Sequence, residues 1–500
     1  YVDNEIDNTI TKSTSRPLYI SEDQLPSKER LVETFFKDKI LPSKYLQFLN
    51  TSKEKVNIPG SEVRTLINQG DPSNRINLTI LGDGYQESER DKFFEDAQRI
   101  SNDLFQEVTF SSFLPLFNVY AIFTPSKDSG ITDIKKKNTI FGLYRNPRGS
   151  KRGIMPGNRY MLERAISLAP ATDYPIVIAN DNFYGGLGGR YAITTRSLTS
   201  GSMVLRHELG HNFGNVGEEY DGGYVYSGAN FSTNPKESWG HWKSRNEFAL
   251  YDSKFLTGDY IWQNLNNNPF VKNFSFNENK KFYYKLKISS VGWSSREDVS
   301  VYLDGVELKL EGVFTKDRSF FETDPILLEK GSHQLKIIEK INDGDNVLAF
   351  ANGYAYPATY DFTENIIDGF NVFASGRRKR GYRPTENMCL MRNMRSKYFC
   401  KVDQENIWLR FLSKLSIIDS VVINQETKRV KVNTLNLTGI TLKWFKKIGR
   451  NYEEIEEFRD KTELELSRSE TGSFKVDVEF NTLEIRKKST YLKSSKTFDI

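Results

Sequence analysis

The chain has 500 residues, of which 38% are hydrophobic and 27% are charged. This composition is typical of a water-soluble protein with room for a catalytic domain and one or two smaller modules. The net charge of +5 is small for this length, and basic residues are interleaved with acidic ones. The sequence therefore predicts no nucleic-acid partner and no membrane partner.

Residues 1–72 are polar and interrupted by prolines, so we expect an N-terminal extension, with a short helix around residues 28–36. From Arg75 onward, strands and helices alternate. Strands are predicted at 76–80, 117–123 and 176–179, and a helix near 160–168. An amphipathic helix between the first two strands carries one apolar face, formed by Phe93, Phe94, Ala97, Ile100, Leu104 and Phe105. This alternation indicates an α/β layer.

The stretch 180–190 is rich in glycine and follows the third strand. It does not match a phosphate-binding loop, because the glycines do not open a helix with the spacing of that motif. We interpret it as a turn that leads to an edge strand at residues 191–195. An exposed strand edge can bind an extended peptide through main-chain hydrogen bonds.

The motif His207-Glu-Leu-Gly-His211 follows that strand. Residues four apart share one face of a helix, so His207 and His211 can present two ring nitrogens to one zinc ion. Glu208 then lies beside the open coordination position, where it can take a proton from a metal-bound water. The alternative is two ordinary histidines on a solvated helix, but the chain has only four histidines. The motif therefore predicts a zinc site with Glu208 as general base.

A third metal ligand is expected shortly after this helix. Gly214 can adopt the left-handed conformation that ends a helix, which lets the chain double back. The long-helix metzincin spacing would need a His or Asp where this chain has Gly217. Glu218, Glu219 and Asp221 remain within reach, and spacing alone does not separate them.

Short alternating apolar runs, separated by turns, fill residues 270–344 and predict a β-sandwich inserted into the catalytic domain. A second set of alternating runs from 416 onward predicts a C-terminal Ig-like β-sandwich with Trp444 as a core residue. The strands predicted in these two regions are 282–288, 299–303, 306–310, 326–328 and 333–338, then 420–423, 429–432, 440–445, 464–466, 473–480 and 483–486.

Cys389 and Cys400 are close in sequence and could form one disulfide, which would place the protein in an oxidising compartment. The alternative is two reduced thiols in a cytosolic protein. Asn-x-Ser/Thr sequons, which permit a secretory route, occur at Asn50, Asn77, Asn230, Asn273 and Asn436. We expect a secreted glycoprotein with one disulfide bond.

An ordered series of motifs resembles the IgA-peptidase family of zinc metallopeptidases. The series comprises Leu81-Gly-Asp-Gly-Tyr85, Phe117-Asn-Val-Tyr120, Pro125-Ser126, Ser129-Gly130, Asn180-Asp181, Tyr184-Gly-Gly186, His207-Glu-Leu-Gly-His-Asn-Phe-Gly214, Glu219-Tyr220, Tyr382-Arg-Pro384, Cys389-Leu-Met-Arg392 and Phe399-Cys400. The resemblance covers roughly residues 75 to 402. It implies a zincin-type domain with a methionine-bearing turn beneath the metal, here at Met391. Met388, Met391 and Met394 could instead be ordinary core residues.

Family members usually carry Asp-Glu-Tyr where this chain has Glu218-Glu219-Tyr220, and Glu219 is the better-matched position. The resemblance therefore implies His207, His211 and Glu219 as the zinc ligands, with Glu218 as the second choice for the carboxylate. The β-rich insert departs from the family pattern and leaves substrate specificity open.

We expect an α+β fold. It consists of an N-terminal extension (1–72), a zincin-like catalytic domain (73–269 and 345–415), the inserted β-sandwich (270–344) and the C-terminal domain (416–500). The expected function is that of a secreted zinc endopeptidase, which hydrolyses peptide bonds of protein or peptide substrates by a metal-activated water with Glu208 as general base. Tyr220 or Tyr382 could stabilise the oxyanion. The oligomeric state is left open.

The alternative function is a binding or adhesion protein with a structural or vestigial zinc site, which recognises glycan or protein through its β-sandwich domains. The intact Glu208 counts against it, because a structural zinc site has no use for a general base.

Overall fold

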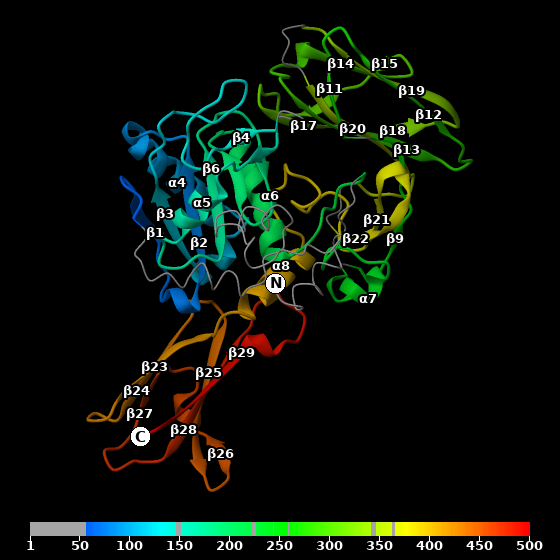
Figure 1. Cartoon of the computed structure of the whole chain (residues 1–500). Helices are drawn as coiled ribbons and strands as arrows, with labels where there is room; N and C mark the ends of the chain where they lie inside the picture. Colours follow the sequence, from blue (N-terminus) through cyan, green and yellow to red (C-terminus); the bar gives the residue numbers. More distant parts are fainter. Residues whose placement is uncertain are drawn as a thin grey trace, which may run out of the picture.

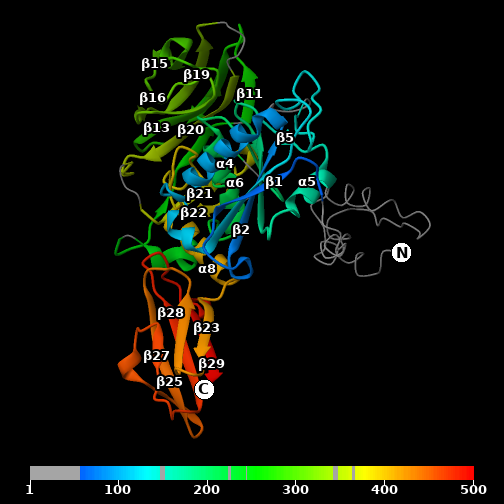
Figure 2. The same ribbon diagram turned by 90° about the vertical axis from the view of Figure 1, so that its left-hand side faces the viewer.

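The computed structural model of the protein describes residues 57–146, 152–222, 227–243, 245–258, 260–341, 347–362 and 366–500. Most of the predicted extension, including the helix expected around 28–36, lies outside the described residues. Figures 1 and 2 show a mixed helix-and-sheet body in the middle, with a β-rich body at one end and a second, elongated β-rich body at the other. No helix of the described part has the length and apolar character needed to cross a bilayer.

A six-stranded mixed sheet forms the centre of the middle body, in the order β1-β3-β2-β6-β8-β7. Neighbouring pairs among β3, β2, β6 and β8 are parallel, while β1 and β7 pair antiparallel at the two edges. The strands are β1 (Glu62–Ile67), β2 (Ile76–Asp83), β3 (Phe117–Phe123), β6 (Tyr174–Ala179), β7 (Gly186–Leu187) and β8 (Ala192–Thr195). β2 and β3 are buried along their whole length, which explains their continuous apolar runs.

Both edges of this sheet differ from the prediction. β1 lies inside the range expected for the N-terminal extension, yet it pairs with β3. The prediction of an edge strand at 191–195 is wrong, because β8 lies between β6 and β7. Residues of the glycine-rich stretch pair with β8 as β7 and form the edge themselves. The outer side of that edge is partly covered, since the Gly186 amide donates to the Arg152 carbonyl at 2.9 Å.

Two helices flank the sheet as the apolar pattern predicts. All six predicted core residues of α4 (Arg90–Phe105) are buried, which confirms the amphipathic interpretation. α5 (Arg159–Ile166) buries Leu162, Ala165 and Ile166 and packs near β2.

The helix with the histidine motif, α6 (Gly201–Gly214), lies against β7 and β8 and against α8 (Lys401–Leu412). Two side chains of α8 reach the C-terminal end of α6: Asn406 Nδ2 donates to the Gly214 carbonyl and Arg410 Nε to the Phe213 carbonyl, each at 2.7 Å. The last carbonyls of a helix lack partners within it. These two bonds therefore hold the end of α6 in place.

The β-rich body that follows α6 consists of two antiparallel sheets. Its strands are β10 (Lys254–Thr257), β11 (Tyr260–Asn264), β12 (Phe270–Phe276), β13 (Phe282–Val291), β14 (Val299–Leu303), β15 (Val306–Glu307), β16 (Leu310–Gly312), β17 (Arg318–Thr323), β18 (Ile326–Leu328), β19 (Gly331–Glu339) and β20 (Val347–Pro357). β10, β11, β13, β16, β17, β18 and β20 form the larger sheet, and the other four form the smaller one.

This body, called the insert below, extends beyond the predicted range of 270–344. β10 and β11 precede that range, and both pair with β20, which follows it. The single strand predicted at 306–310 is instead two short strands in different sheets, because β15 pairs with β14 and β16 pairs with β17.

The chain returns to the middle body through a small sheet of β9 (Leu250–Tyr251), β21 (Gly369–Phe373) and β22 (Lys379–Arg383). Three further short elements belong to the middle body, namely β4 (Tyr144–Arg145), β5 (Ile154–Met155) and α7 (Pro235–Trp239).

The C-terminal body has seven strands in sheets of three and four, ordered β23-β24-β27 and β26-β25-β28-β29. The strands are β23 (Ile418–Asn424), β24 (Arg429–Thr434), β25 (Ile440–Ile448), β26 (Asn451–Glu454), β27 (Glu463–Glu465), β28 (Ser473–Phe480) and β29 (Lys493–Asp499). Trp444 is fully buried, as predicted. No strand forms at 483–486, and the last strand is instead β29.

Candidate active site

The two motif histidines lie on one face of α6 with both rings oriented by backbone carbonyls. His207 Nδ1 lies 3.3 Å from the Leu390 carbonyl, and His211 Nδ1 lies 2.8 Å from the Val216 carbonyl. A carbonyl only accepts, so each Nδ1 carries a hydrogen, and Nε2 is the atom of each ring that can bind a metal. The two Nε2 atoms are 3.1 Å apart.

Glu218 completes a cluster with these histidines, here called the open cluster. Its carboxylate oxygens lie 3.1 Å from His207 Nε2 and 3.2 Å from His211 Nε2. Donors bound at 2.0–2.1 Å to a tetrahedral ion are separated by about 3.3 Å, so the three side chains fit a zinc ion. Burial opposes ionisation of Glu218, but His207 and His211 hold its pKa at about 2. The carboxylate is therefore ionised, as a metal ligand must be.

The three acidic residues that spacing left unresolved point to three different partners. Glu218 faces the histidines. Asp221 is fully buried and pairs with Arg392 at 2.9 Å and with Arg383 at 3.3 Å. Glu219 is buried beside Asn230, whose Nδ2 donates to its Oε1 at 3.2 Å. Glu218 and Glu219 are neighbours in the sequence, yet their side chains contact different groups.

The expectation that Glu219 is the third ligand does not fit this arrangement. Glu219 belongs instead to a second group, with Cys389, Cys400 and Asp403, while Glu218 stands with His207 and His211.

Glu208 lines the cleft next to the open cluster. Burial raises the pKa of this carboxyl group, although His207 and His211 partly offset the effect. The main chain comes unusually close to it at Gly188, where an added Cβ would lie 2.1 Å from Glu208 Oε2. One glycine of the glycine-rich stretch is therefore needed to leave space for this carboxylate.

Met391, the methionine expected beneath the metal, packs against α6. An added Cβ at Gly210, between the two histidines of the motif, would lie 2.6 Å from Met391 Sδ. Met391 is fully buried, and its carbonyl accepts the Glu219 amide at 3.2 Å. The methionine turn, the segment around Met391, thus contacts α6 and also holds the segment that carries Glu218.

The helix ends as predicted at Gly214, but the left-handed residue is the next one. Asn215 has φ 49° and ψ 45°, and its amide donates to the His211 carbonyl. Asparagine is the residue other than glycine that most readily adopts this conformation. The reversal carries the chain back so that Glu218 reaches the histidines.

Comparison with known proteins assigns this region. The family model described as IgA Peptidase M64 matches residues 65–280. These residues match the IgA peptidase family. The match covers most of the six-stranded sheet, α6 and the open cluster, and it supports a metallopeptidase.

No curated protein matches the chain. Among solved structures, a cycloisomaltooligosaccharide glucanotransferase from Paenibacillus sp. aligns at 8% sequence identity with a TM-score of 0.14, over 66% of this chain and 51% of its own. The chain thus spans about half the length of that structure.

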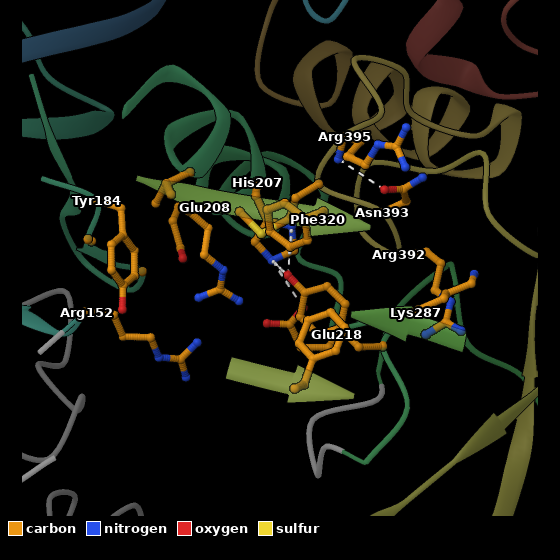
Figure 3. Close-up of a pocket in the computed structure, with 18 of the residues that line it drawn as sticks. Arg152, Tyr184, His207, Glu208, Glu218, Lys287, Phe320, Arg392, Asn393 and Arg395 are labelled. Carbon is orange, nitrogen blue, oxygen red and sulfur yellow. Dashed lines mark hydrogen bonds and ion pairs between the residues drawn. The ribbon is translucent and has the colours of Figure 1, made fainter. Parts of the chain in front are cut away.

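The open cluster faces a cleft of about 600 Å³ between the middle body and the insert. The insert supplies one wall through Lys287, Ile288, Arg318, Phe320, Phe321, Glu322 and Phe350. Figure 3 shows Arg152 and Tyr184 on one side of the cleft, and Lys287 and Arg392 on the other. Burial, with Arg392 nearby, lowers the pKa of Lys287 to about 8.

Asp317 of the insert connects this wall to the middle body through hydrogen bonds. Its Oδ2 accepts the Ser200 hydroxyl at 2.7 Å, just before the first residue of α6, and its Oδ1 accepts the Tyr184 amide at 2.9 Å. The sequence pattern did not single out Asp317 or the cleft-lining Phe320. The sequence did offer one signal for this wall: Phe320 and Phe350 are aromatic residues that lie off the core-facing side of the insert.

Of the two tyrosines considered for oxyanion stabilisation, Tyr220 lies in the cleft. Its hydroxyl is 2.8 Å from His207 Nε2, and its ring stacks on the His207 ring with centroids 5.3 Å apart. Tyr382 is not among the cleft-lining residues, and its hydroxyl accepts Lys379 Nζ at 2.9 Å.

The predicted disulfide is not present, because Cys389 and Cys400 are free and buried. Cys389 Sγ instead donates to Asp403 Oδ2 at 3.0 Å. Among the sequons that the structure describes, Asn77 and Asn230 are buried, whereas Asn273 and Asn436 face solvent.

Proposed function

We propose that the protein is a zinc-dependent endopeptidase whose metal is held by His207, His211 and Glu218. The observation that carries the proposal is that these residues form a cluster open to a cleft, with Glu208 in the wall beside it. A structural site is closed by four protein ligands, whereas a catalytic site keeps a position for water and substrate. Three protein ligands and a neighbouring carboxylate match the catalytic type.

A zinc ion bound here would lower the pKa of a water molecule and polarise the carbonyl group of the scissile bond. Glu208 is the general base that takes the proton from the attacking water and later delivers it to the leaving amine. Its raised pKa suits both steps, because the group must bind and release one proton near neutral pH. Tyr220 is the tyrosine whose hydroxyl lies close enough to stabilise the oxyanion.

The cleft supports cleavage within extended protein segments. It lies between the glycine-rich stretch and the insert wall, and the main chain around Gly188 approaches Glu208 without an intervening side chain. A binding protein with a vestigial metal site would gain nothing from keeping Glu208 in this position, so the binding function is not favoured.

Secretion is proposed on the family match together with the exposed sequons at Asn273 and Asn436. The free thiols of Cys389 and Cys400 do not support secretion. A glycosidase-sensitive mass shift at either asparagine, in protein expressed through a eukaryotic secretory route, would show that these sequons are accessible.

The experiment that tests the proposed function is digestion of casein and of a peptide library by the full chain. We expect cleavage that a chelator abolishes and that added zinc restores. If the zinc-loaded protein cleaves no peptide at any pH tested, the proposal is contradicted and the binding function becomes the better account.

A further inference from the structure

A second group of metal-ligand side chains lies on the other side of the segment that carries Glu218. Glu219, Cys389, Cys400 and Asp403 each place one ligand atom within 4.8 Å of the others. They come from three segments: the reversal after α6, the methionine turn and the beginning of α8. This group is called the closed cluster, because every one of its four residues is at most 1% exposed.

The hydrogen bonds within the closed cluster leave part of its acceptor capacity unused. Glu219 Oε1 accepts from Asn230, and Asp403 Oδ2 accepts from Cys389. The remaining carboxylate oxygens, Glu219 Oε2 and Asp403 Oδ1, are buried and accept no hydrogen bond from the residues that the structure describes. Buried acceptors without partners are rare and costly, and a missing ion is one of the standard reasons for them.

The types of donor and their spacing identify the class of ion. Two thiols and two carboxylates match tetrahedral zinc, because thiolate sulfur selects soft or borderline ions over magnesium and calcium. Cys400 and Asp403 are three positions apart at the start of a helix, which is the spacing of a zinc half-site. A divalent ion would also offset the charge of two buried carboxylates.

We propose that Glu219, Cys389, Cys400 and Asp403 form a second metal site that binds zinc through two thiolates and two carboxylates. Binding releases to solvent the two thiol protons and any proton held by the two carboxyl groups, as the sulfur and oxygen atoms become ligands. Four protein ligands leave no open position, so this site is structural and does not take part in hydrolysis.

The position of the closed cluster indicates what a zinc ion bound there would do. Glu219 is the residue after Glu218, and its amide is held by the Met391 carbonyl. An ion in the closed cluster would tie this segment to the methionine turn and to α8, whose side chains hold the end of α6. The second site thus positions Glu218 for the first.

The test is the absorption spectrum of the full chain, purified under reducing conditions and loaded with cobalt(II) in place of zinc. We expect a sulfur-to-cobalt charge-transfer band, because Cys389 and Cys400 are the only cysteines of the chain. The open cluster contains no sulfur ligand. The band therefore reports the second site regardless of whether the first site binds metal or catalyses hydrolysis.

Zinc content measured on two reciprocal variants completes the experiment. We expect two zinc ions in the parent chain and one in each variant. His207→Asn/His211→Asn keeps the cobalt–sulfur band, and Cys389→Ser/Cys400→Ser loses it while retaining the zinc ion of the open cluster.

A parent chain with no cobalt–sulfur band and at most one zinc ion overturns the proposal, whether its thiols are free or joined in a disulfide. The spectrum of the unaltered chain decides the question even if the cysteine variant fails to fold.

Discussion

The open and closed clusters are separated by a single peptide bond between Glu218 and Glu219, yet they differ in exposure and in chemistry. The side chains of His211 and Glu218 are 22% and 28% exposed, and their cluster faces a cleft. All four residues of the closed cluster are at most 1% exposed, and two of them supply sulfur. The comparison teaches that access to solvent, more than the number of carboxylates, distinguishes the proposed catalytic site from the proposed structural one.

The largest effect is expected from Glu208→Gln, which tests whether the open cluster is catalytic. The substitution keeps the shape of the side chain but removes the base, so kcat should fall by about 100-fold to 10,000-fold. Zinc content should stay at the parent level, because Glu208 is not a ligand. Glu426→Gln, on an exposed turn of the C-terminal body, is the matched control and should cleave at the parent rate. Equal rates for both variants would refute the assigned base.

The different roles proposed for Glu218 and Glu219 are tested by the variants Glu218→Ala and Glu219→Gln. Zinc affinity and peptide cleavage are measured on each. Mutation of residues that only support a ligand lowers metal affinity by about 10–100-fold. Glu218 is proposed as a ligand itself, so its loss should lower the zinc affinity of the open cluster by about 100-fold or more. Glu219→Gln should leave the open cluster loaded. The reverse result, with an empty open cluster only in Glu219→Gln, would restore Glu219 as the third ligand.

Gly188→Ala tests whether the space around Glu208 matters for rate. The added Cβ would meet Glu208 Oε2 at 2.1 Å, so the carboxylate must move. A displacement of this order costs up to about 100-fold in rate, and we expect a lower kcat with unchanged zinc content. Gly240→Ala is the control, since the nearest atom to its Cβ would be 3.8 Å away. A parent-like kcat for Gly188→Ala would show that Glu208 tolerates displacement.

The smallest effect is expected from Phe320→Ala in the insert wall. Phe320 lines the cleft without contributing to the open cluster, so its loss should lower kcat/KM by about tenfold, the equivalent of one aromatic contact of about 1–1.5 kcal/mol. Zinc content and the melting temperature should remain unchanged. Val306→Ala, exposed on the smaller sheet, serves as the control. An unchanged kcat/KM on every peptide tested would exclude this part of the wall from the substrate site.

Local periodicity in the sequence was sufficient to predict much of the fold. The buried strands β2 and β3 and the apolar face of α4 follow patterns that repeat within one element. The edge of the sheet was predicted incorrectly, because which strand lies outermost depends on whether Gly186 and Leu187 pair with β8. The extent of the insert was missed for a similar reason, since β10 and β11 join it only by pairing with the distant β20.

The sequence by itself placed the two proposed histidine ligands and the proposed base, because the positions of His207, Glu208 and His211 within one helix follow from helical periodicity. Only the tertiary structure decided between Glu218 and Glu219. Their segment is not helical, and its orientation depends on the reversal at Asn215 and on the bond between the Glu219 amide and the Met391 carbonyl. Contacts between residues more than 170 positions apart select which neighbour faces the histidines, and no local pattern encodes such contacts.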